Sequence, residues 1–264
     1  MEKANTWTVD AHCHWSDERV FADAEREIPI MIAKGIAAFQ LGGVDPREWR
    51  RQQELQRKFP RRIFCAFGLH PYFVATSTRE PLEQAWQDLS SLALAADALG
   101  EMGLDFRRHY LIAGREIQTE FFARQLQLAG KLEKPAVLHI VRAHEEALRE
   151  LKTAPISGMV HAFTAGPKVA CRYLDLGLHL SIGAKLLHPE TADLADSVRA
   201  APLDRLLVES DCPDQPPPGQ SHHDSLTVWL ILRRIAELKK LPFADVVEQT
   251  RANLFALLKK EFRP

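Results

Sequence analysis

The sequence has no CxxC pair, no apolar run that approaches the length of a membrane span, and no excess of charge of one sign. Its cysteines, Cys13, Cys65, Cys171 and Cys212, are scattered along the chain, which argues against a disulfide framework or a structural zinc site built on thiolates. The 34 Lys and Arg residues nearly balance the 35 Asp and Glu residues, and the formal net charge is -1. The chain therefore has no global basic field to attract duplex nucleic acid, and any nucleic-acid substrate must be held by local contacts.

The N-terminus lacks the positive segment and the apolar core of a secretory signal. Residues Met1 to Asn5 lead directly into strand-like sequence. Together with the scattered cysteines, this predicts a cytoplasmic protein that makes no contact with membranes. We also expect the protein to be a monomer.

Short apolar segments alternate with longer amphipathic ones along the chain, and this alternation is the main indication of the fold. The 264 residues and the 46% share of hydrophobic residues suit one globular domain. The apolar segments are predicted strands that end near Cys13, Leu41, Gly68, Met102, His139, His161, Ile182 and Glu209. Eight strands separated by helices predict an α/β fold, a (β/α)8 TIM barrel that forms a single domain over residues 1–264.

The amphipathic segments between the strands are predicted helices. They cover Asp23 to Lys34, Pro46 to Phe59, Pro81 to Ala95, Glu116 to Leu132, Ala143 to Lys152, Pro167 to Leu176 and Pro189 to Ala200, with closing helices from Leu226 to Lys240 and from Phe243 to Lys260. The proline-rich segment from Asp214 to Asp224 is predicted to be an extended loop after the eighth strand. In a barrel enzyme, that loop lies on the face that carries the active site.

The stretch Val9-Asp10-Ala11-His12-Cys13-His14 places Asp10, His12 and His14 at alternate positions of the first strand. In a regular strand, the three side chains share one face. Two imidazoles beside a carboxylate can hold a divalent metal ion. A His-x-His pair alone is more often a polar strand end whose histidines bond locally. The interpretation therefore depends on whether further ligands lie at the ends of other strands.

Unusual polar residues do lie at the ends of other predicted strands, namely His70, Glu101, His139, Arg142, His161 and Asp211. The carboxyl ends of the strands meet at one mouth of a barrel, where barrel enzymes carry their catalytic groups. Glu101 follows a small, apolar segment, where a bare buried carboxylate would be costly. Metal coordination removes that cost, and the two oxygens of a carboxylate can span two ions. Each histidine alone would more often be a structural residue of the core, but their joint position predicts a metal site at the C-terminal mouth.

These motifs together resemble the TatD family of metal-dependent hydrolases and deoxyribonucleases, within the amidohydrolase-like barrels. The resemblance covers nearly the whole chain in the family's order. It rests on Val9-Asp10-Ala11-His12-Cys13-His14, Gly68-Leu69-His70-Pro71, Gly100-Glu101-Met102-Gly103-Leu104-Asp105, Lys134-Pro135-Ala136-Val137-Leu138-His139, Val160-His161-Ala162-Phe163-Thr164, Leu207-Val208-Glu209-Ser210-Asp211-Cys212-Pro213 and Asn253-Leu254-Phe255.

The resemblance implies a site for two divalent ions. One ion would be held by His12, His14, Glu101 and Asp211, and the second by Glu101, His139 and His161, with Glu101 bridging the two. His70 and Arg142 would contact the substrate or its phosphate. Mixed imidazole and carboxylate ligands favour Zn²⁺, with Mn²⁺, Ni²⁺, Fe²⁺ or Mg²⁺ as alternatives.

The implied function is hydrolysis of DNA phosphodiester bonds by a metal-activated water, on single strands or strand ends, with Asp211 as the candidate general base. The alternative is hydrolysis of a small ester, lactone or amide by the same ions. A non-catalytic scaffold barrel is the third interpretation. It predicts that some metal-ligand residues have been replaced, yet the sequence has a suitable histidine or carboxylate at every one of these positions. The segments Phe106 to Tyr110 and His222 to Asp224 depart from the family pattern and leave the substrate preference open.

Overall fold

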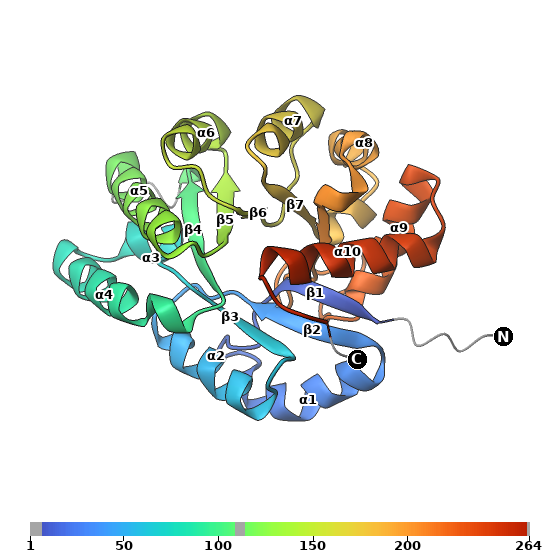
Figure 1. Cartoon of the computed structure of the whole chain (residues 1–264), viewed down its shortest axis with the longest axis horizontal. Coiled ribbons are helices and arrows are strands. Elements are labelled where there is room, and N and C mark those ends of the chain that lie inside the picture. The colour runs from blue at the N-terminus through green and yellow to red at the C-terminus, as the bar shows by residue number, and fades with distance from the viewer. Residues whose placement is uncertain (1–6, 109–113, 263–264) are drawn as a thin grey trace.

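Eight parallel strands follow one another in sequence order, and the helices lie outside them (Figure 1). The computed structural model describes residues 7–108 and 114–262. The strands are β1 (Thr8–Cys13), β2 (Ile36–Leu41), β3 (Ile63–Phe67), β4 (Ala98–Asp105), β5 (Ala136–Val141), β6 (Gly158–Val160), β7 (His179–Ile182) and β8 (Leu206–Val208). Just beyond β8, the N–H of Asp211 donates to the carbonyl of His12 at 3.0 Å, and the N–H of His14 donates to the carbonyl of Cys212 at 2.8 Å. These bonds join the last strand to the first, so the predicted (β/α)8 barrel is confirmed.

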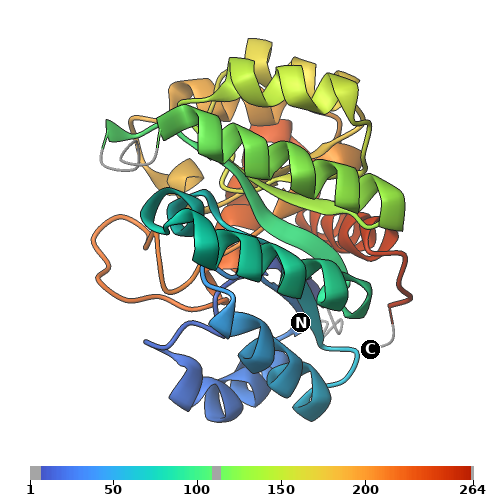
Figure 2. The same cartoon turned by 90° about the vertical axis from the view of Figure 1, so that its left-hand side faces the viewer.

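The helices surround the strands as a ring. Those between the strands are α1 (Phe21–Ala33), α2 (Arg47–Lys58), α3 (Pro71–Thr76), α4 (Arg79–Leu92), α5 (Gly114–Leu132), α6 (His144–Thr153), α7 (Pro167–Asp175) and α8 (Ala192–Ala200), and α9 (Thr227–Lys239) and α10 (Phe243–Leu257) follow β8. Short 3-10 turns form at η1 (Ala93–Ala95), η3 (Ala184–Leu187) and η4 (Leu203–Arg205). Figure 2 shows the long loop after β8, in orange, standing out from one side of the molecule. Across the described ranges, none of the helices has the length and apolar character needed to span a bilayer.

The alternation of side chains along each strand separates the barrel interior from the layer beneath the helices. On β5, Ala136 and Leu138 belong to the large apolar cluster that includes the helices. Val137 belongs to a second, smaller apolar cluster, and His139 lines the cavity at the mouth. A histidine at the end of an inward-facing row therefore points into the mouth.

The first strand departs from this alternation. Its pairing with β2 shifts between Asp10, which pairs with Phe39, and Cys13, which pairs with Leu41. Three steps along β1 thus match two along β2, and the extra residue puts the side chains before and after it out of phase. The regular strand expected over this stretch is therefore interrupted by a bulge.

The bulge separates Asp10 from the two histidines. Both carboxylate oxygens of Asp10 accept hydrogen bonds from Ser210, one from its N–H at 2.8 Å and one from its hydroxyl at 2.6 Å. The prediction that Asp10 shares a face with His12 and His14 is therefore wrong. Asp10 instead fixes the segment after β8 that carries Asp211.

Two helices differ from the sequence prediction for local reasons. The short helix α3 was not predicted; it begins after His70, whose ring Nδ1 accepts the N–H of Tyr72 at 2.9 Å and so caps the helix. Helix α8 begins at Ala192 rather than at Pro189. The hydroxyl of Thr191 donates to the carbonyls of Lys185 and His188, which keeps the preceding residues in a turn.

Candidate metal centre

The ring nitrogens of His12 and His14 lie beside two carboxylates at the mouth of the barrel. Their Nε2 atoms are 3.3 Å apart. Asp211 Oδ1 lies 3.1 Å from His14 Nε2 and 3.7 Å from His12 Nε2. Glu101 Oε1 lies 3.6 Å from His12 Nε2 and 3.7 Å from His14 Nε2. These four side chains, which the resemblance assigns to one ion, therefore face a common point.

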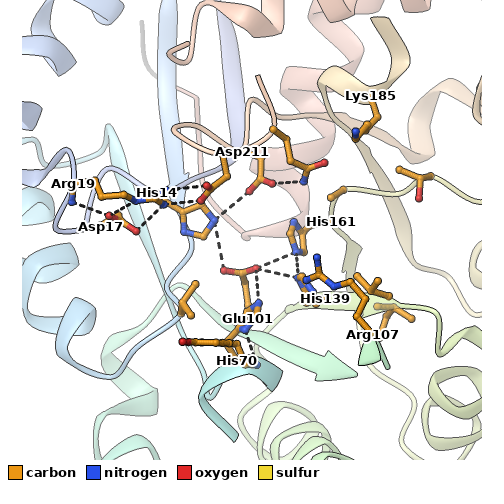
Figure 3. Close-up of a pocket in the computed structure, with 18 residues that line it drawn as sticks. His14, Asp17, Arg19, His70, Glu101, Arg107, His139, His161, Lys185 and Asp211 are labelled. Carbon is orange, nitrogen blue, oxygen red and sulfur yellow. Dashed lines mark hydrogen bonds and ion pairs between the residues drawn. The ribbon is translucent and has the colours of Figure 1, made fainter. Parts of the chain in front are cut away.

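The other oxygen of Glu101 faces a second group of potential metal-coordinating atoms, the ring nitrogens of His139 and His161 (Figure 3). Glu101 Oε2 lies 3.0 Å from His161 Nε2 and 3.6 Å from His139 Nδ1. The two ring nitrogens of this group are 2.9 Å apart. Glu101 thus stands between the two groups, with one oxygen toward each.

The donor atoms of the cluster have the spacing and chemistry that divalent ions require. Ligands of one tetrahedral zinc ion, each about 2.1 Å from it, lie roughly 3.4 Å apart, and the separations above bracket that value. Glu101 Oε1 and His12 Nδ1 are buried without a hydrogen-bond partner among the described residues, and an unpaired buried carboxylate oxygen is costly. The trios of potential ligands found in the described part of the chain all draw on this cluster, and one of them also includes His70. The residues therefore fit bound divalent ions.

The charges within the cluster compensate one another. Burial opposes charge on Glu101, yet the surrounding imidazoles hold the pKa of this carboxyl well below its usual value. Burial also opposes charge on His14, yet the carboxylates of Glu101 and Asp211 raise its pKa to about 10. The pKa of His161 is likewise raised, against burial, by Glu101 and Glu209. Because an imidazole binds a metal in its unprotonated form, an ion would displace these protons on binding.

A carboxylate lies behind each histidine of the second group. Asp105 Oδ2 is 3.4 Å from His139 Nε2, the ring nitrogen that faces away from Glu101. Glu209 Oε1 is 3.6 Å from His161 Nδ1 and accepts the N–H of Ala162 at 2.6 Å. Such carboxylates fix the tautomer and the direction of a ligating imidazole. Asp105 therefore holds the His139 ring by a hydrogen bond, and Glu209 lies behind the His161 ring at ion-pair distance.

His70 also reaches the cluster, but the nitrogen that it presents carries a hydrogen instead of a free lone pair. Its Nε2 lies 3.7 Å from Glu101 Oε2, but its Nδ1 already accepts the N–H of Tyr72. A neutral imidazole that accepts at one nitrogen carries its hydrogen on the other, and burial beside His139 lowers the pKa of His70 well below the usual value. His70 therefore presents an N–H donor to the cavity rather than a metal ligand.

The cations at the mouth differ from the one predicted. Arg142 is exposed, has a φ of 55°, and is not among the residues that line the cavity above the cluster. The cavity is lined instead by Arg19, Arg107 and Lys185. A left-handed residue turns the chain, so the position of Arg142 just after β5 did not place its side chain in the cavity.

The loop after β8 contributes a residue that the sequence analysis missed. Gln215 lines the cavity, and its Nε2 donates to Asp211 Oδ2 at 2.5 Å. His222 and His223 line a separate surface pocket near α9 instead. In the other departing segment, Arg107 lines the cavity, and His109 and Tyr110 lie outside the described residues. The loop after β8 thus contacts the cluster through the hydrogen bond from Gln215 to Asp211.

Gly42, directly after β2, also escaped the sequence analysis. A Cβ at this position would lie 2.2 Å from His12 Cε1, 2.7 Å from His12 Nε2 and 3.0 Å from Glu101 Oε1. His12 is fully buried, so its ring cannot turn outward into solvent to avoid the contact. Only glycine therefore leaves room for the side chains of both His12 and Glu101.

We expect Gly42→Ala to displace His12, to lower the metal content and to reduce kcat/KM by roughly a hundredfold, because a catalytic group moved by about 1 Å loses that much. Metal analysis and steady-state kinetics measure the effect. Gly130→Ala is the matched control. Gly130 lies within α5, and a Cβ there would make only an ordinary van der Waals contact with Ile156, at 3.9 Å. That variant should keep full activity and gain about 0.5–1 kcal/mol of stability. Unchanged metal content in Gly42→Ala would contradict the steric argument.

The comparisons with known proteins agree with this geometry. A family model described as TatD related DNase matches residues 9–259 of the chain. The chain belongs to the TatD family. It is 30% identical to YabD, a metal-dependent hydrolase of Bacillus subtilis, over 250 residues that cover 92% of this chain and 96% of YabD.

Two further TatD relatives match over nearly their full length. The human deoxyribonuclease TATDN3 is 24% identical over 277 residues, which cover 98% of this chain and 97% of TATDN3. The crystal structure of YjjV, a TatD homologue from Escherichia coli, matches with a TM-score of 0.86 at 24% identity and covers 97% of this chain and 100% of that one. The protein is accordingly a metal-dependent hydrolase of the TatD family.

Proposed function

We propose that this TatD hydrolase is a deoxyribonuclease that cleaves phosphodiester bonds of DNA, with single strands or strand ends as its substrate. The observation that carries the proposal is Glu101, whose two oxygens face two groups of donors at 3.0 to 3.7 Å. Two ions bridged by one carboxylate suit phosphodiester hydrolysis. The family description and the name of the human relative support DNA as the substrate.

The metal set is proposed to be two divalent ions, with Zn²⁺ first and Mn²⁺, Ni²⁺, Fe²⁺ or Mg²⁺ as alternatives. His12, His14, Glu101 and Asp211 would hold one ion, and His139 and His161 would share Glu101 with the second. The four imidazoles in the set favour zinc and its neighbours over magnesium. When bound, the ions would polarise the phosphodiester and lower the pKa of the attacking water.

The protein's own groups would bind the substrate and move the proton. Asp211 is the proposed general base, because its Oδ1 faces the cluster while Gln215 holds its Oδ2. His70 would donate its Nε2–H to a phosphate oxygen. The cavity has a volume of about 930 Å³, which is large enough for a nucleotide.

A small ester, lactone or amide is the second candidate substrate. Among the described residues, three Lys or Arg side chains line the cavity. Two of them, Arg19 and Arg107, already pair with carboxylates. Paired cations attract a polyanion weakly, which favours a small or neutral substrate.

The test is a panel of substrates offered to the protein loaded with Mn²⁺ and, separately, with Zn²⁺. Single-stranded DNA, duplex DNA, RNA and small carboxylic esters are compared, and chelation by EDTA is the negative control. We expect single-stranded DNA to be cleaved fastest and chelation to abolish cleavage. Cleavage of the small esters alone would overturn the deoxyribonuclease proposal and support the second candidate.

The remaining expectations stay predictions. They are a cytoplasmic location, a monomer, and one domain over residues 1–264. Gel filtration with light scattering would test the second, and limited proteolysis the third.

A further inference from the structure

Arg19 and Arg107, at the mouth of the barrel, each form ion pairs with carboxylates of the protein. Arg19 pairs with Asp17 at 2.8 Å and with Asp214 at 2.6 Å. Arg107 pairs with Asp105 at 2.5 Å, the carboxylate that orients a histidine of the cluster. Each guanidinium therefore has its charge compensated by the protein.

Lys185 is the third cation of the cavity lining, and its situation is different. Its side chain is exposed, and over the described ranges its Nζ has no hydrogen-bond acceptor or carboxylate partner. Its backbone, in contrast, is held in place. The carbonyl of Lys185 accepts the N–H of His188 at 3.1 Å and the hydroxyl of Thr191 at 3.1 Å. The backbone of Lys185 is thus fixed, whereas its ammonium group lies at the end of a flexible side chain and has no carboxylate among the described residues to compensate its charge.

Lys185 also has a defined position relative to the ligands. It belongs to η3, directly after β7. Figure 3 shows it beside the cavity on the side of His161, away from His14 and Arg19. A substrate that binds at the cluster therefore meets Lys185 on one side only.

We propose that Lys185 binds a phosphate oxygen of the DNA strand and so holds the strand on the His161 side of the mouth. The inference rests on the proposed deoxyribonuclease function. A lysine ammonium is a compact point charge with three donors, which suits a phosphate that approaches from solvent. Because the charge has no competing carboxylate, the contact forms without breaking an ion pair.

The experiment measures binding separately from cleavage. The probe is a fluorescently labelled single-stranded oligodeoxynucleotide with phosphorothioate linkages, which resist hydrolysis, and its Kd for the Mn²⁺-loaded full-length chain is measured by anisotropy at several salt concentrations. Lys185→Gln is compared with Lys185→Arg, which keeps the charge. Lys131→Gln, an exposed lysine in the last turn of α5 that does not line the cavity, is the matched control. Metal content and Tm are measured for every variant.

We expect Lys185→Gln to weaken binding roughly fivefold to tenfold and to make the slope of log Kd against log salt shallower by about 0.7, the value for one phosphate of a single strand. Lys185→Arg should restore most of both, and Lys131→Gln should change neither. Equal Kd and equal salt slope in Lys185→Gln and the wild type would overturn the inference, as would a wild type that does not bind the probe. Failure of the wild type to cleave an unmodified strand contradicts the proposed function instead, and the binding comparison still decides the role of Lys185.

Discussion

Replacing Glu101 by Gln should lower kcat by roughly four orders of magnitude and reduce the bound metal from the proposed two ions to one or none. The carboxylate offers Oε1 to His12 and His14 and Oε2 to His161. An amide has one oxygen, so the glutamine could coordinate only one of the two proposed ions and would turn its NH₂ toward the other. Metal analysis by mass spectrometry and steady-state kinetics at saturating metal measure the two effects.

The Glu101→Gln protein should still fold. The raised pKa of His14 and of His161 depends on the charge of Glu101. When that charge is removed, release of one proton from either imidazole restores the charge balance of the buried cluster, and Asp211 and Glu209 still face His14 and His161. Circular dichroism and the thermal unfolding temperature check this point.

Glu48→Gln is the matched control for a buried carboxylate. Glu48 is 3% exposed, and its oxygens accept the hydroxyl of Ser16 and the N–H groups of Val44 and Asp45. This variant should lose stability but keep its metal. If Glu101→Gln retained two ions and full turnover, the bridging role would be refuted.

The sequence was sufficient to predict the fold and the convergence of the ligands, for a topological reason. All strands of a (β/α)8 barrel are parallel, so any residue at the end of a strand reaches the same mouth. His161 directly follows the short apolar strand β6, and His139 and Glu101 interrupt the apolar strands β5 and β4. The strand ends could therefore be combined into one site without knowledge of any distance.

The parts that could not be predicted depend on local backbone geometry. One extra residue in β1 moved Asp10 away from the histidines, and no composition signal marks such a bulge. The left-handed turn at Arg142 kept its side chain out of the cavity lining, where Lys185 is found instead. Gly42 matters only because His12 and Glu101, from other strands, approach it closely. Contacts of this kind arise between distant segments, and periodicity along one segment does not report them.

Asp211→Asn should reduce kcat roughly a thousandfold even when metal is saturating, because the variant loses its proton acceptor. Asn is the suitable replacement. Asp211 has a φ of 59°, and Asn is among the few residues that tolerate this left-handed conformation. Ala at this position would add backbone strain to the chemical change.

The hydrogen bonds around Asp211 allow its two proposed roles to be separated. Its Oδ1 faces His14 and its Oδ2 accepts the amide of Gln215. In Asp211→Asn, the amide of Gln215 can rotate to present its oxygen to the new NH₂, which leaves the asparagine oxygen facing His14 as a neutral ligand. Metal affinity should then fall, by at least tenfold, but binding should persist. Titration with Mn²⁺, followed by kcat at the plateau, therefore distinguishes a lost ligand from a lost base.

Asp214→Asn is the matched control on the same loop. Asp214 lines the cavity but pairs with the exposed Arg19, and exposed ion pairs contribute little energy. Its metal affinity should equal that of the wild type. If excess Mn²⁺ restored full kcat to Asp211→Asn, Asp211 would be a ligand only, and the proton would have to leave through another group. His70 could not take that part, because its Nδ1 accepts the N–H of Tyr72 and its Nε2 therefore already carries a hydrogen.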